Sequence, residues 1–293
     1  MIINLKNVLE INGLTKVYND FTLDHVNLSL PYGKIMGLIG ENGAGKTTII
    51  KLILNAIRRD DGKIEIFGKD NIQFESIIKE KLGVGLDQCY FDDCLDIKAI
   101  STIMKPIFKN WDNKIYFSYI DRLKLSPSKR IGSYSKGMKA KLNIAITLST
   151  HPKLLILDEP TTGLDPIIRD EILQIYLDYV KKQNASILFS SHITSDIEKI
   201  ADIVTILHKG KIILTINQKD IKNQFSEVVF NGNEPFDSSK KGVLFYIKSV
   251  DSVRALIRKD SYQFDHHKYF PVNIEKVLLY SVNGEKGKGE TLL

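Results

Sequence analysis

One short glycine-rich segment limits what this chain can fold into more than any other feature. It follows the apolar run Ile35–Ile39, precedes a stretch of helical periodicity over 46–57, and reads Gly40-Glu41-Asn42-Gly43-Ala44-Gly45-Lys46-Thr47. Glycines allow backbone N–H groups to turn toward phosphate oxygens, and the start of a helix adds positive potential. The segment therefore predicts a nucleotide-binding α/β fold, in which Lys46 reaches the β- and γ-phosphates and Thr47 ligates Mg²⁺.

Two adjacent carboxylates follow a second apolar run at 154–157. These residues are Asp158 and Glu159. Ligands of parallel α/β sheets bind at the carboxyl ends of the strands, where this run would deliver both side chains. Alone, the pattern is as often a strand that meets solvent. Together with the phosphate loop, it predicts that Asp158 holds Mg²⁺ through water and that Glu159 polarises an attacking water.

The alternation of patterns along the 293 residues indicates how the chain is organised. Strands are expected at 9–18, 21–30, 35–39, 63–67, 154–157, 187–189 and 203–207, with helices over much of 91–150 and at 166–182. Strands that alternate with helices predict a parallel sheet with crossover helices. Beyond residue 215 we expect strands near 228–230 and 243–247, a helix near 252–259, and an unordered tail over 284–289.

Composition excludes several classes of protein. No 18-residue stretch lacks Asp, Glu, Lys and Arg, so no helix is expected to span a bilayer, and the first twelve residues lack the apolar core of a signal peptide. Cys89 and Cys94 are too few for a disulfide framework, which favours a cytosolic protein. The formal net charge of +6 suits a phosphate ligand, a membrane surface or nucleic acid, and does not choose among them.

The order of five motifs resembles that of the ATP-binding subunit of an ABC transporter. After the phosphate loop come Ser135-Lys136-Gly137-Met138, Asp158-Glu159-Pro160, Gly163-Leu164-Asp165 and Ser190-Ser191-His192. The resemblance covers residues 1 to about 215. It implies an α/β P-loop NTPase core of ABC type with an antiparallel β subdomain, a helical subdomain at about 88–150 that carries the signature segment, and a small α+β appendage at 216–293.

The resemblance also implies an arrangement of site residues around ATP and Mg²⁺. The nucleotide-binding set would be Tyr18, Gly40, Glu41, Asn42, Gly43, Ala44, Gly45, Lys46, Thr47 and Thr48. Tyr18 would lie under the adenine, although a lone tyrosine there is more often a packing residue. A head-to-tail dimer would hold two ATP molecules, with each site completed by the partner's signature segment, Ser135 to Met138. Asp165 would contact the partner in the D-loop, and His192 would contact the γ-phosphate and hold Glu159 in place, beside Lys46.

Two motifs depart from the family pattern. The common signature Leu-Ser-Gly-Gly-Gln appears here as Tyr-Ser-Lys-Gly-Met at 134–138, so Lys136 adds a charge. In the Q-loop, counting eight residues back from Leu95 reaches Asp87 and not Gln88. Either side chain would serve as a Mg²⁺ ligand, and the spacing favours Asp87.

The signature variant and Phe-Lys-Asn-Trp-Asp at 108–112 resemble bacterial exporters that use separate ABC-2-type permeases, a group with drug, bacitracin-type and peptide-toxin exporters. The resemblance implies an ATP-hydrolysing motor subunit, cytoplasmic and peripheral on the inner face of the membrane. It would pair with itself or with a related subunit, and would bind a separately encoded permease. The alternative is a soluble ABC ATPase acting on nucleic acid or ribosomes, but such factors resemble two ATP-binding domains in one chain, so nucleic acid is not expected.

Overall fold

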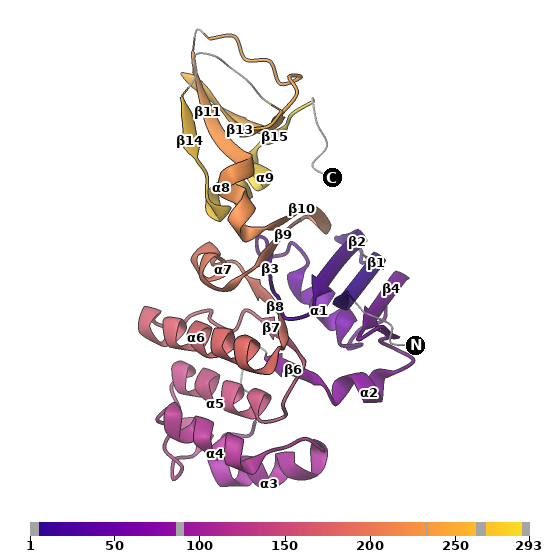
Figure 1. Cartoon of the computed structure of the whole chain (residues 1–293), viewed down its shortest axis with the longest axis vertical. Helices are drawn as coiled ribbons and strands as arrows, with labels where there is room; N and C mark the ends of the chain where they lie inside the picture. The colour runs from indigo at the N-terminus through magenta and orange to yellow at the C-terminus, as the bar shows by residue number, and fades with distance from the viewer. Residues whose placement is uncertain (1–5, 86–90, 233, 262–267, 289–293) are drawn as a thin grey trace.

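The computed structural model describes residues 6–85, 91–232, 234–261 and 268–288 of the chain. Within these ranges, strands form three sheets, and helices pack on and beyond them (Figure 1). Figure 1 shows the C-terminal sheet at one end of the molecule and α3 and α4 at the other. No helix among these residues is both long and apolar enough to cross a bilayer.

The first sheet is antiparallel, with strand order β2-β1-β4-β5. Its strands are β1 (Asn7–Val17), β2 (Thr22–Pro31), β4 (Asp61–Ile66) and β5 (Lys69–Asp70). Leucines and isoleucines on these strands are buried in one cluster together with α1, which spans Lys46–Ile53. The sheet is the antiparallel β subdomain that the sequence predicted, and it packs beside the phosphate loop.

The second sheet is largely parallel, with strand order β10-β9-β3-β8-β7-β6. Its strands are β3 (Ile35–Ile39), β6 (Leu82–Gly85), β7 (Leu154–Asp158), β8 (Ser186–Ser191), β9 (Ile203–His208) and β10 (Lys211–Asn217), of which only β10 runs antiparallel to its neighbour. The helices α6 (Pro166–Gln183) and α7 (Thr194–Ile200) connect β7 to β8 and β8 to β9. Because β3, β8 and β7 are neighbours and parallel, their carboxyl ends meet at one edge of the sheet.

The helical region lies between β6 and β7 in the sequence. Its helices are α3 (Ile97–Ile107), α4 (Asn113–Arg122), the 3₁₀ turn η1 (Ile131–Ser133) and α5 (Lys136–Leu148), while the short α2 (Glu75–Lys79) precedes β6. Side chains of Asp96, Asp112 and Ser135 cap the N-termini of α3, α4 and α5 by accepting backbone hydrogen bonds. These caps explain where the helices begin.

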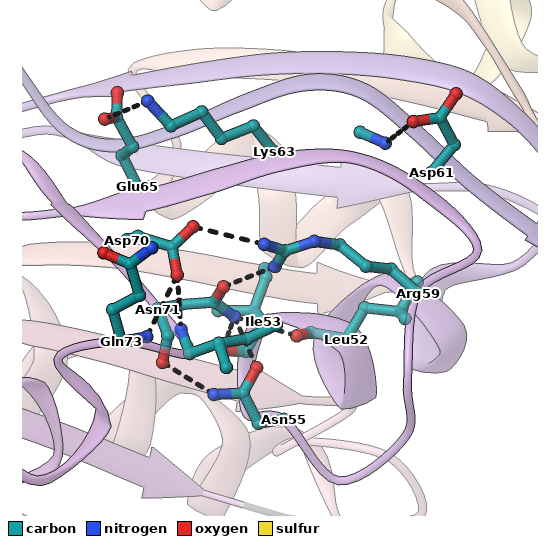
Figure 2. A network of polar contacts seen from close by, with 12 residues as sticks. Leu52, Ile53, Asn55, Arg59, Asp61, Lys63, Glu65, Asp70, Asn71 and Gln73 are labelled. Carbon is teal, nitrogen blue, oxygen red and sulfur yellow. Dashed lines mark hydrogen bonds and ion pairs between the residues drawn. The ribbon is translucent and has the colours of Figure 1, made fainter.

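A buried polar network fixes the C-terminal end of α1 to the first sheet (Figure 2). The amide nitrogen of Asn71 donates to the carbonyl oxygens of Leu52 and Ile53, at 3.1 and 3.0 Å, and Arg59 Nη1 donates to Asn71 Oδ1 at 2.6 Å. A second guanidinium nitrogen of Arg59 contacts Asp70 at 3.2 Å. The last carbonyl groups of a helix have no partner within it, so Asn71 satisfies two of them and anchors the helix that carries Lys46.

The C-terminal region forms a third, antiparallel sheet with order β14-β11-β13-β12-β15. Its elements are η2 (Gln218–Asp220), α8 (Ile221–Gln224), β11 (Phe225–Asn231), β12 (Val243–Lys248), β13 (Ser252–Arg258), β14 (Tyr269–Pro271), α9 (Ile274–Asn283) and β15 (Glu285–Lys286). Buried residues of α9 and β11 belong to the same hydrophobic cluster as those of α6 and α7. Ile274 N also donates to Glu198 Oε1 on α7, at 3.2 Å.

Two predictions for this region are wrong. The segment predicted as a helix, 252–259, is the central strand β13, because pairing with β11 and β12 on both sides buries Ala255, Leu256 and Ile257. The helices of the region are instead the short α8 and the longer α9. The predicted unordered tail is ordered through Lys288, because β15 pairs with β12 and Gly287 N donates to Leu244 O at 2.9 Å. Gly289 lies outside the described residues.

Candidate active site

The phosphate loop connects the end of β3 to the start of α1. Gly45, which precedes the helix, has a φ of 112°, a conformation that favours glycine. A β-carbon on Gly40 would fall 2.3 Å from the carbonyl oxygen of Leu207 at the end of β9. The two glycines therefore allow both the turn into the helix and the close contact between the loop and the sheet.

Lys46, the first residue of α1, points back into the loop. Its side chain is 6% exposed, and its ammonium donates to the carbonyl oxygens of Gly40 and Glu41, at 2.8 and 3.2 Å. Lys46 Nζ also lies 3.4 Å from Glu159 Oε1. The loop thus holds one buried positive charge at a fixed position, beside a carboxylate.

Asp158 connects the phosphate loop to β8. Thr47 Oγ1 donates to Asp158 Oδ2 at 2.9 Å, and Ser190 Oγ donates to Asp158 Oδ1 at 2.5 Å. Asp158 and Thr47 offer hard oxygen donors next to a phosphate-binding loop, a donor set that suits Mg²⁺ when a triphosphate and water supply the other ligands. Among the described residues, no cluster of three or more His, Cys, Asp or Glu side chains could form an all-protein metal site.

Glu159 follows β7 in an unusual backbone conformation. Its φ is 50°, and its N–H donates to Ser190 O and to Ser190 Oγ, at 3.2 and 3.1 Å. Its Oε2 accepts from Thr162 Oγ1 at 2.7 Å and contacts His192 Nδ1 at 2.6 Å. Burial raises the pKa of Glu159, but the Thr162 hydrogen bond and the charges of Lys46 and His192 together bring that pKa below its ordinary value. The Glu159 carboxylate is therefore held ionised and in one orientation.

A cavity of about 700 Å³ opens over these groups. The predicted residues that line it are Tyr18, Glu41, Asn42, Gly43, Gly45, Lys46, Thr47, Thr48, Lys136, Glu159 and His192. Gly40, Ala44 and Asp158 lie directly behind that lining or next to it in the chain. Asp87 and Gln88 lie outside the described residues.

The signature segment begins α5. Ser135 is the N-cap of that helix and accepts from Met138 N at 3.3 Å, while Gly137 packs against Ile168 of α6. Lys136 lines the cavity of its own chain, and its Nζ lies close to Gly163, where a β-carbon would fall 2.5 Å from it. Of the four signature residues, the structure brings only Lys136 into the lining of this cavity.

Asp165, predicted as the D-loop residue, caps α6. Its Oδ1 accepts from Ile167 N and Ile168 N, at 3.1 and 3.0 Å. The side chain lies at the surface and does not line the cavity.

Three polar residues of the site region were not assigned a role from the sequence. Thr162 holds Glu159, Ser190 holds both Asp158 and the backbone of Glu159, and Asp20 lines the cavity near Tyr18. For Thr162, the sequence signal was a hydroxyl residue placed three positions after the candidate base Glu159, within a turn. For Ser190, it was the position of a serine at the end of a strand that neighbours β7.

This geometry defines the class of protein. A loop that cradles phosphate, a threonine–aspartate pair and an oriented glutamate at the edge of a parallel sheet are the parts of a P-loop nucleotide hydrolase. Residues 23–162 match the family model described as ABC transporter.

Two relatives and one solved structure cover most of the chain. The chain is 33% identical over 291 residues to bacitracin transport ATP-binding protein BcrA of Bacillus licheniformis, covering 97% of this chain and 88% of that one. It is 34% identical over 239 residues to lantibiotic transport ATP-binding protein SrtF of Streptococcus pyogenes, covering 80% and 100% of the two chains. A solved ATP-binding subunit of an ABC transporter superposes with a TM-score of 0.66 at 27% identity, covering 74% of this chain and 92% of that one.

The chain therefore belongs to the ABC transporter family. It is an ATP-binding subunit of an ABC transporter, and it hydrolyses ATP. The prediction of an ABC-type P-loop fold is confirmed. The alternative of a soluble ABC ATPase acting on nucleic acid or ribosomes is not favoured, because these relatives are transport proteins by name.

Proposed function

We propose that this chain is the motor subunit of an exporter for a peptide antibiotic, working through a separately encoded permease. One observation carries the proposal: Lys46, Thr47, Asp158, Glu159 and His192 converge at one sheet edge, in a chain whose relatives at 33–34% identity are bacitracin and lantibiotic transport ATP-binding proteins. The chain would lie in the cytoplasm on the inner face of the membrane, where ATP and the permease meet.

The phosphate loop binds the triphosphate. Backbone N–H groups of 40–48 surround the β-phosphate, and Lys46 exchanges its contact with Glu159 for one with the γ-phosphate. Tyr18 lines the cavity and is 43% exposed, so its ring is available to stack on the adenine. Thr47 and Asp158, with the Q-loop residue Asp87, would hold Mg²⁺, which would neutralise phosphate charge when bound.

Glu159 acts as the general base. Its carboxylate accepts a proton from the attacking water while Thr162 and His192 keep it pointed at the γ-phosphate. His192 lines the cavity and is partly exposed, so its Nε2 is available to contact the γ-phosphate. A carboxylate held ionised by its neighbours is ready to accept that proton at neutral pH.

Two chains form the working unit. Ser135 and Gly137 of the partner subunit complete each site, because the start of α5, where Ser135 and Lys136 are exposed, carries N–H groups and a positive dipole end that suit a γ-phosphate. Lys136 brings an additional positive charge, and Asp165 lies on the exposed segment that meets the partner. Both halves of the motif set stand in one chain, which allows either a homodimer or a pair with a related subunit.

The chain divides functionally near residue 215, within β10. Residues 1–215 hold every motif that contacts nucleotide, and 216–293 form an accessory region whose helix α9 packs on α7.

Resistance and ATPase assays on the same complex test the proposal. Cells that make this chain with its permease should survive higher concentrations of bacitracin or of a lantibiotic, and a Glu159→Gln version should lose that protection at equal expression. Purified complex should hydrolyse ATP only with Mg²⁺ present. Unchanged resistance together with normal ATPase activity would contradict the export role, and would leave the assignment as an ATPase intact.

A further inference from the structure

We propose that Asp196 is a positioning residue of this ATPase, which fixes His192, Glu159 and the Gly163–Asp165 turn relative to one another through Thr161 and Arg169. The inference rests on the proposed roles of Glu159 and His192 in hydrolysis. Asp196 does not line the nucleotide cavity, and none of the five motifs contains it. It acts through its neighbours.

Asp196 joins the helix after His192 to the segment after Glu159. It lies on α7, four residues beyond His192, and is 1% exposed. Its Oδ2 accepts from Thr161 Oγ1 at 2.6 Å, and Thr161, two residues beyond Glu159, is fully buried. A buried carboxylate is costly unless it is bonded, so this short hydrogen bond restrains α7 against the turn that carries the base.

Arg169 extends the contact to the Gly163–Asp165 turn. From the first turns of α6, its Nη2 donates to the carbonyl oxygen of Leu164 at 3.3 Å, and its Nε lies 3.9 Å from Asp196 Oδ1. Within the part of the chain that the structure describes, neither Arg169 Nε nor Asp196 Oδ1 has a hydrogen-bond partner, although both atoms are buried. The buried Asp196 carboxylate and the buried Nε of the partly exposed Arg169 therefore lie close to, but not within, bonding range.

The charges around Asp196 come from two helices. Arg169 and Asp170 are on α6, and Lys199 is on α7. Burial raises the pKa of Asp196, and the Thr161 hydrogen bond, Arg169 and Lys199 oppose that rise, while Asp170 adds to it. The carboxylate is thus surrounded by partners that specify one orientation, and it links three segments that meet at the reaction site.

A surface ion pair between the same two helices provides a matched control. Lys199 Nζ lies 2.6 Å from Asp170 Oδ1, and both side chains are more than half exposed. This pair also ties α7 to α6, but it touches neither Thr161 nor the Gly163–Asp165 turn. If helix association alone mattered, removing either pair would have comparable consequences.

The experiment compares steady-state ATP hydrolysis of the full chain and its Asp196→Ala, Asp196→Asn and Asp170→Asn variants, with Mg²⁺. We expect Asp196→Ala to lower kcat by about tenfold to a hundredfold, because a displacement of about 1 Å at a reacting group has effects of that size. KM and the binding of a fluorescent ATP analogue should stay within about twofold of wild type. The kcat of Asp196→Asn, which keeps an oxygen for Thr161, should lie between those of wild type and Asp196→Ala. The kcat of Asp170→Asn should match wild type.

A double-mutant test covers the case in which Asp196→Ala does not fold. Thr161→Val keeps the branched shape and removes the hydroxyl, so it should lower kcat on its own, and Thr161→Val with Asp196→Asn should be no slower than the slower single variant. Normal kcat in the folded Asp196 variants, or equal losses in Asp170→Asn, would overturn the inference. A wild-type chain without ATPase activity would instead overturn the proposed function.

Discussion

Replacing Glu159 by glutamine separates nucleotide binding from hydrolysis. In the native chain, Glu159 Oε2 accepts from Thr162 Oγ1 at 2.7 Å, and glutamine keeps an oxygen for this bond. The change removes the negative charge that lies 3.4 Å from Lys46 Nζ. An amide cannot take a proton from water. We therefore expect hydrolysis to fall by about 10²- to 10⁴-fold, the usual contribution of a positioned general base.

ATP affinity should rise in the same variant. In the nucleotide-free chain, Glu159 competes with the γ-phosphate for Lys46, and both side chains are largely buried. An ion pair at the upper end of the range for partly exposed pairs contributes about 1 kcal/mol, which corresponds to about fivefold in Kd. With binding strengthened and hydrolysis lost, the ATP-bound dimer should accumulate.

Three measurements on one preparation test the assignment of Glu159 as the general base. Phosphate release gives kcat, titration with a fluorescent ATP analogue gives Kd, and size-exclusion chromatography with Mg-ATP gives the dimer fraction. Glu171→Gln, which removes a surface carboxylate paired with Lys141 at 2.7 Å, is the control and should behave as wild type. A Glu159→Gln chain that hydrolyses ATP at more than a tenth of the wild-type rate, or binds it more weakly, would refute the assignment.

Other predictions concern sites away from the base. Asn71→Ala should lower the free energy of unfolding by about 1–3 kcal/mol in urea titrations, since it leaves buried partners unbonded at the end of α1, whereas an unchanged midpoint would contradict that role. Asp87→Ala should reduce ATPase activity most at low Mg²⁺ while Gln88→Ala has little effect, and the reverse ranking would shift the Q-loop register by one. A chain ended after Asn217 should keep its ATP affinity in equilibrium binding but melt at a lower temperature, because the cluster shared with α9 becomes exposed; a loss of affinity in folded protein would show that the accessory region completes the site.

The nucleotide site was largely predictable because its determinants are local. The phosphate loop needs a particular set of φ angles, and the buried strands that flank it are short uninterrupted apolar runs, so both leave direct marks on the sequence. The expected strand 35–39 and the expected helix from 166 coincide with β3 and α6 to within a residue at each end. The rule that parallel strands present their carboxyl ends together placed Glu159 at the edge of the sheet, while the role of His192 beside it came from the resemblance to ABC subunits.

The C-terminal region was less predictable because its structure depends on distant partners. The segment 252–258 has the composition of either a helix or a strand, and it is a strand because β11 and β12 pair with it from both sides. The Gly- and Lys-rich stretch after α9 is ordered by pairing with β12, about forty residues away in the sequence. Asp196 escaped notice for the same reason, since its bonded partner Thr161 lies 35 residues earlier in the chain. Thr162 differs, because its partner Glu159 is only three residues away and a lone hydroxyl in a turn gives a weak signal.

The contact of α9 with α7 has a consequence for how the surface of α7 evolves among homologues. A homologue that stops after β10 has no α9 to cover this part of α7, so the surface there must be compatible with water. In this chain Glu198 instead meets Ile274 N from α9 and accepts, through its backbone carbonyl, from Gln218. We expect the side chains on the outer surface of α7 to have changed together with the gain or loss of the accessory region. The composition of this surface in a homologue should therefore indicate whether its ancestors carried that region.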